Sequence, residues 1–172
     1  MRAGSFFVRT WRILSILGFV GSLYSNYISF PVDVAVRFNG IGQAVQYVGR
    51  ETIFYLSIGI FLLVYVITNA VIKLFPKLPA ERIPNPNPVK WQGYRQELVA
   101  VYINWFLALA AAFNTILGLG LMVLSFLNRS DRTNVGPADY AWLLPMSTFI
   151  LAAVVVSLPI RLLMKPPVEY VP

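Results

Sequence analysis

The chain has 172 residues, of which 58% are apolar and only 12% are charged. Soluble domains carry about 25% charged residues, so a soluble fold would leave too much apolar surface in water. The sequence contains no Cys and no His, which excludes disulfides, thiol nucleophiles and imidazole-based metal sites or proton transfer. We expect residues 1–172 to form a single integral membrane domain without catalytic residues, metal or cofactor.

Four long apolar stretches predict transmembrane helices at about 11–30, 52–75, 98–127 and 140–164. Each reaches the roughly 20 residues that a helix needs to cross a hydrocarbon core of ~30 Å. The first stretch also has the order of charges and small residues seen in signal peptides, but its length favours a retained span. The sequence therefore predicts an all-α membrane protein, a bundle of four transmembrane helices.

The basic residues are distributed unequally between the two sides of these spans. Ten lie before span 1, between spans 2 and 3, or at the end of span 4, and four lie in the other two connections. By the positive-inside rule, both termini and the proline-rich loop 76–97 should be cytoplasmic. Anionic lipid on that side is the expected partner of these cations, and no nucleic-acid-binding domain is left in the chain.

Small and polar residues recur every three or four positions in spans 1 and 3, which places them on one helix face. Such stripes let helix backbones approach closely in lipid. We expect them to pack within the bundle, or partly against another membrane subunit. The candidates for this packing are Gly18, Ser22, Ser25, Asn104, Ala108, Ala111, Thr115 and Gly118.

The loop after span 1 has the alternation of a strand, because Val34, Val36 and Phe38 are separated by polar or small residues. Asn39 and Gly40 could supply the positive φ angles of a two-residue hairpin turn. We therefore predict a short extracytoplasmic β-hairpin, or an extended loop, over the outer end of the bundle.

This loop resembles a motif of bacterial multi-pass membrane proteins that include the SdpI-type immunity proteins. Their pattern is close to Pro-x-His-Phe-Asn-x-x-Gly-x-x-x-x-Tyr. Here Ala35 stands at the proline position and Arg37 at the histidine position. The resemblance implies a bacterial inner-membrane protein that binds a toxin, a signal or a protein through its outer loop. The binding candidates are Arg37, Phe38, Asn39, Gly42, Tyr47 and Arg50.

The proline-rich loop is similar to a second family pattern, an Asn-Pro followed by an aromatic residue, Arg and Glu before span 3. Its candidates here are Asn87, Pro88, Trp91, Arg95 and Glu97. Trp91 would otherwise be an anchor in the membrane interface. The crowding of prolines predicts an extended segment rather than a helix.

Three functions are compatible with these features. The resemblance favours a non-enzymatic protein that binds a partner through its outer loop. A small accessory subunit of a larger membrane complex is the alternative. A lipid-acting enzyme or carrier is the third, but its candidate carboxylates, Glu51 and Glu97, are expected at opposite membrane faces and could not act on one bond.

Overall fold

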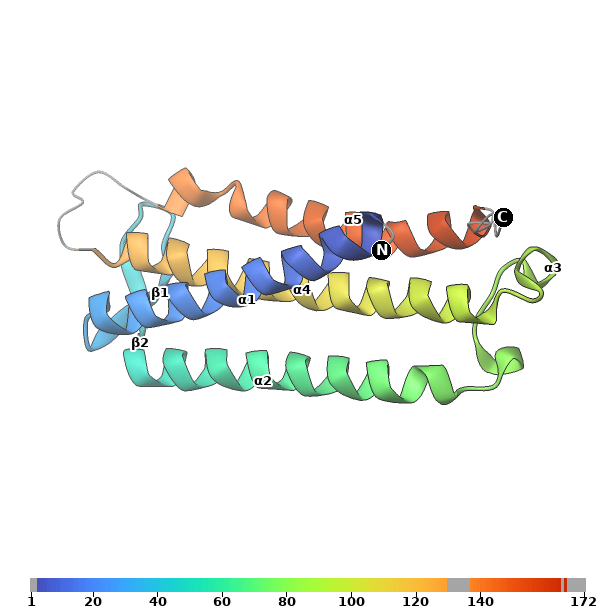
Figure 1. The fold of residues 1–172 in the computed structure, drawn as a ribbon. Helices are drawn as coiled ribbons and strands as arrows, with labels where there is room; N and C mark the ends of the chain where they lie inside the picture. The colour runs from blue at the N-terminus through green and yellow to red at the C-terminus, as the bar shows by residue number, and fades with distance from the viewer. Residues whose placement is uncertain (1–2, 130–136, 165, 167–172) are drawn as a thin grey trace.

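Four long helices dominate the computed structural model, which describes residues 3–129, 137–164 and 166 (Figure 1). Each of the four is long and apolar enough to span a membrane. The chain is therefore mostly helical, as expected for a multi-pass membrane protein. The four helices are α1 (Ala3–Ser29), α2 (Arg50–Leu74), α4 (Arg95–Leu127) and α5 (Leu143–Leu163).

The observed helix ends differ from the predicted spans. α1 begins at Ala3 instead of residue 11, and α4 begins at Arg95 instead of residue 98. α4 begins with Arg95, Gln96 and Glu97, and because these residue types are good helix formers, that helix extends beyond its apolar part. The predicted start of span 4, at about residue 140, falls within the candidate span Pro137–Leu163, in which a 3-10 turn, η3 (Pro137–Tyr140), precedes α5.

α4 is the central helix, and α1, α2 and α5 all pack against it. α1 and α4 run in the same direction (Figure 1). At their contact, a Cβ atom added to Gly118 would lie 3.4 Å from the Cα atom of Phe19. The missing side chain of Gly118 thus lets the two backbones approach closely. Nearby, the indole N–H of Trp11 donates a hydrogen bond of 3.2 Å to the Thr115 hydroxyl.

The buried face of α1 is displaced from the predicted stripe. It consists of Ser15, Phe19, Leu23 and Asn26. The last three each follow one of the predicted small residues, Gly18, Ser22 and Ser25, by one position. The large Phe19 packs where α4 has a glycine, so a small residue is needed on only one of the two helices. The predicted packing residues are placed as follows: Ala108, Ala111 and Gly118 are buried, Ser22, Asn104 and Thr115 are half-buried, and Gly18 and Ser25 are exposed.

A two-stranded antiparallel sheet, β1 (Asp33–Phe38) and β2 (Ala44–Gly49), connects α1 to α2. It lies across one end of the bundle, which we call the hairpin end (Figure 1). The strand predicted from the alternation of residues 32–38 is therefore present. The hairpin reaches from the end of α1 and the start of α2 to the junction of α4 and α5.

The opposite end, which we call the proline-rich end, contains the connection from α2 to α4 (Figure 1). The prediction of an extended segment was wrong here, because three short helical turns form in it: η1 (Phe75–Lys77), η2 (Ala80–Arg82) and α3 (Pro88–Trp91). Proline is compatible with the first turn of a helix, where its missing N–H would have no partner. Pro88 occupies that position in α3.

Candidate functional site

The turn of the hairpin is organised by the side chain of Asn39. Its Oδ1 atom accepts hydrogen bonds from the backbone N–H groups of Ile41 (3.1 Å) and Gln43 (2.8 Å). The carbonyl of Asn39 accepts a further bond of 3.0 Å from the N–H of Gly42, whose φ is 80°. This is a three-residue loop in which glycine provides the left-handed position.

The predicted two-residue turn at Asn39 and Gly40 was therefore wrong. Gly40 does not have a positive φ, and a Cβ atom added there would meet no atom within 4 Å. The residue that needs glycine is Gly42. Asn39 and Gly42, two of the binding candidates, thus have a structural role in the turn that requires no ligand.

The hairpin is attached to the bundle through Asn128, directly after α4. The Asn128 Oδ1 atom accepts a hydrogen bond of 2.7 Å from the Ala35 N–H, and its Nδ2 group donates one of 3.0 Å to the Ala35 carbonyl. A side-chain amide here pairs with β1 as a neighbouring strand would. Ala35 and the adjacent Val34 are buried. At the other end of the hairpin, a Cβ atom on Gly42 would lie 3.8 Å from Pro137.

The remaining outer-loop candidates differ in exposure. Arg37 is exposed, and its side chain has no hydrogen bond or ion pair among the described residues. Tyr47 is 59% exposed. Phe38 is half-buried, and the guanidinium of Arg50 lies 5.5 Å from the ring centre of Tyr27. Only Arg37 and Tyr47 of the six are both exposed and without an assigned structural role.

The candidates of the proline-rich end are mostly part of the folded core. Trp91 is 3% exposed, and its indole N–H donates a hydrogen bond of 2.9 Å to the Leu162 carbonyl. It is therefore neither an interface anchor nor an accessible ligand-binding residue. Arg95 donates to the carbonyls of Pro76 (2.7 Å) and Leu78 (2.8 Å), in and directly after η1.

The other three residues of this motif do not form one site. The Asn87 N–H donates a hydrogen bond of 3.0 Å to the Asn85 side chain, and Pro88 begins α3. Glu97 lies in the first turn of α4. The two sets of motif residues therefore lie at opposite ends of the bundle and are not brought together.

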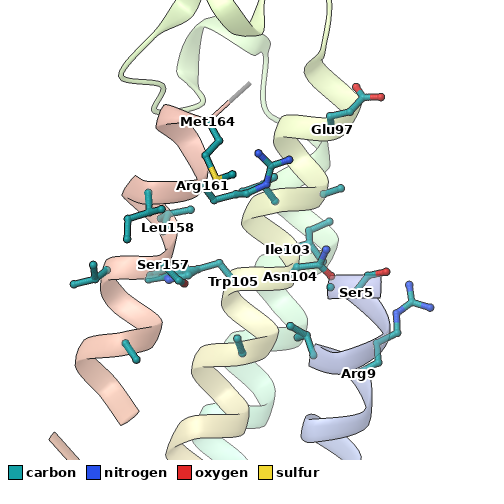
Figure 2. Close-up of a pocket in the computed structure, with 18 of the residues that line it drawn as sticks. Ser5, Arg9, Glu97, Ile103, Asn104, Trp105, Ser157, Leu158, Arg161 and Met164 are labelled. Carbon is teal, nitrogen blue, oxygen red and sulfur yellow. The ribbon is translucent and has the colours of Figure 1, made fainter. Parts of the chain in front are cut away.

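A groove of about 1230 Å³ lies between the first turns of α1, the start of α4 and the end of α5. Figure 2 shows its residues on these three helices. Three of its lining residues, Gly4, Ala100 and Ala153, have small side chains. Trp105 also lines it and bridges α4 to α5, because its indole N–H donates a hydrogen bond of 2.7 Å to the Val154 carbonyl.

Two of the described lining residues are cationic, Arg9 from α1 and Arg161 from α5. The guanidinium of Arg161 lies 5.8 Å from the ring centre of the buried Trp91, so the core helps to hold it. In the sequence, both arginines contributed only to the predicted orientation in the membrane. No local pattern could have found the groove, because its walls come from three segments that are far apart in the chain.

Comparison with known proteins gives no match to any family model, curated protein or solved structure.

Proposed function

We propose that this chain is a non-enzymatic membrane protein that binds a partner polypeptide at the exposed face of its hairpin. The observation that carries this proposal is that Asn128 fixes β1 to α4 while Arg37 and Tyr47 stay exposed. A fixed surface loses less conformational entropy on binding than a loose loop. Arg and Tyr are also enriched among the residues that dominate binding energies at protein interfaces.

The likeness to SdpI-type proteins extends this proposal to the kind of partner. It favours a secreted toxin or a signal that arrives from outside a bacterial inner membrane. Arg37 replaces the family's histidine, so its contact would be a permanent positive charge. An acidic or carboxylate-bearing segment of the partner is the natural complement.

The proposed orientation places both termini in the cytoplasm and the hairpin outside, because of the asymmetry in Lys and Arg. Labelling of single cysteines tests it, since the chain has no native Cys. A thiol reagent that does not cross membranes should modify Gly40→Cys in intact cells. It should modify Lys77→Cys only after the membrane is opened. The reverse result would overturn the orientation.

Photo-crosslinking tests the partner. A photoreactive amino acid in place of Tyr47 should crosslink a polypeptide in cells, and Arg37→Glu should reduce that yield at equal protein abundance. Tyr24 of α1 is 69% exposed and serves as the control position, where only lipid should be crosslinked. A stoichiometric set of larger membrane subunits, retained equally by the Arg37→Glu variant, would instead identify an accessory subunit and overturn the proposal.

A further inference from the structure

The groove between α1, α4 and α5 has two ends of different chemistry. Gln96, Glu97 and Arg161 line it towards the proline-rich end, and Ala108 and Ala153 line its other end. Arg9 lies on α1 near the level of Ala108, because its neighbours Val8 and Trp11 pack against the cluster that contains Ala108. In a membrane, such a groove would face lipid along its length. The combination of a charged end and an apolar end matches an amphipathic molecule and not a soluble metabolite.

Its depth corresponds to one leaflet of a bilayer. Glu97 and Ala108 line the groove from α4, and eleven residues of helix between them rise by about 16 Å. Half of a hydrocarbon core of ~30 Å is about the same length. An acyl chain that entered the groove beside α4 would thus extend from the interface to about the centre of the bilayer.

The charges at the groove favour an anionic headgroup. Arg9 and Arg161 reach it from two different helices, and Glu97 is the only acidic side chain among the described lining residues. The lining charge is therefore +1. Figure 2 shows the side chain of Arg9 extending towards the end where Arg161 and Glu97 lie. A long basic side chain that reaches towards the interface in this way is typical of membrane proteins.

We propose that this groove is a binding site for one anionic phospholipid of the leaflet at the proline-rich end. Its phosphate would lie between Arg9 and Arg161, with one acyl chain against Ala108 and Ala153. Burial of an acyl chain in the groove gains little free energy over its burial in bulk lipid, since both environments are apolar. Selectivity therefore comes from the headgroup, and anionic lipid should be retained in preference to zwitterionic lipid.

Native mass spectrometry of the full-length protein tests this site, with phosphatidylglycerol and phosphatidylcholine supplied in equal amounts. Wild type should retain phosphatidylglycerol preferentially. Arg9→Gln should lower that preference about five-fold. Removing the charge of Arg161 as well should lower it about as much again. Arg161→Lys keeps the charge and should retain the preference. Lys77→Gln removes an exposed cation at the same end but outside the groove, and is the matched control.

A space-filling variant separates the groove from a general basic surface. Ala153 is exposed and lines the groove, so Ala153→Phe should displace the lipid while the helices stay folded. Excess inorganic phosphate should not compete. The proposal is overturned if Lys77→Gln acts as strongly as Arg9→Gln, or if Ala153→Phe leaves retention unchanged. It is also overturned if Ala153→Phe changes the oligomeric state and not lipid retention, because the groove would then hold a second copy.

Discussion

The two ends of the bundle hold their non-helical segments in different ways. At the hairpin end, β1 and β2 pair with each other, and one side chain, Asn128, joins them to α4. At the proline-rich end the described residues form no sheet. Side chains of Trp91, Arg95 and Tyr102 donate hydrogen bonds to carbonyls of distant segments, around a cluster of buried apolar residues.

The difference follows from the sequence of each connection. Proline has no N–H, so a proline-rich segment leaves carbonyls without backbone partners, and side-chain donors must satisfy them. The hairpin satisfies most of its own groups but has little apolar core, and an isolated hairpin is only marginally stable. We therefore expect that the proline-rich end stabilises the whole fold and that the hairpin depends mainly on Asn128 and on the burial of Val34.

The largest expected effect is at Trp91. Trp91→Ala should lower the free energy of unfolding by about 3–5 kcal/mol, because it removes a large buried ring and leaves the Leu162 carbonyl without its donor. Trp91→Phe should lose about 1–3 kcal/mol, because it keeps most of the packing but not the hydrogen bond. Unfolding in detergent measures both. Trp142, which is 46% exposed, provides the control, and equal losses for Trp142→Ala and Trp91→Ala would contradict the role of the core.

A smaller and more local effect is expected at Asn128. Asn128→Ala should destabilise the hairpin by about 2 kcal/mol, because it leaves the buried N–H and carbonyl of Ala35 unpaired. Hydrogen exchange should accelerate in β1 and β2 while α1, α2 and α4 stay protected. Global unfolding in place of local opening would show that the hairpin is not a separate unit.

Ala35→Pro sharpens this test because it removes the N–H that Asn128 binds. Proline is tolerated on edge strands, so the main loss should be the hydrogen bond to Asn128. The two substitutions should therefore be non-additive, with little further loss when Ala35→Pro is added to Asn128→Ala. Additive losses would mean that the proline acts by distorting the strand.

The local patterns of the sequence predicted the helices and strands better than the contacts between them. Apolar runs indicated the four helices, and alternation indicated β1. The pairing of Asn128 with Ala35 joins residues 93 positions apart, and that of Trp91 with Leu162 joins residues 71 positions apart, so no local pattern reports them. In lipid, hydrophobicity also does not tell which helix face is packed, which explains why the predicted stripe on α1 was displaced from Phe19.

Within the hairpin, two glycines allow a matched comparison. Gly42→Ala should destabilise the hairpin by about 1–2 kcal/mol, since an L-residue is strained at the φ of 80°. Gly40→Ala should be close to neutral, because its Cβ atom would point into open space. Hydrogen exchange in β1 and β2 compares the two variants. If Gly40→Ala were the more harmful, the observed turn would be wrong.

The smallest expected effect on stability is at Arg37. This variant tests whether the hairpin only connects α1 to α2 or also binds a partner. The Arg37 side chain is exposed and has no hydrogen bond or ion pair among the described residues, so Arg37→Ala should change the free energy of unfolding by less than about 0.5 kcal/mol. The hairpin should keep its hydrogen-exchange protection. Under the proposed function, the same variant should nevertheless lose most of the crosslinking from position 47. Unchanged crosslinking would exclude Arg37 from the binding surface, and a loss of stability above about 1 kcal/mol would show that its role is structural.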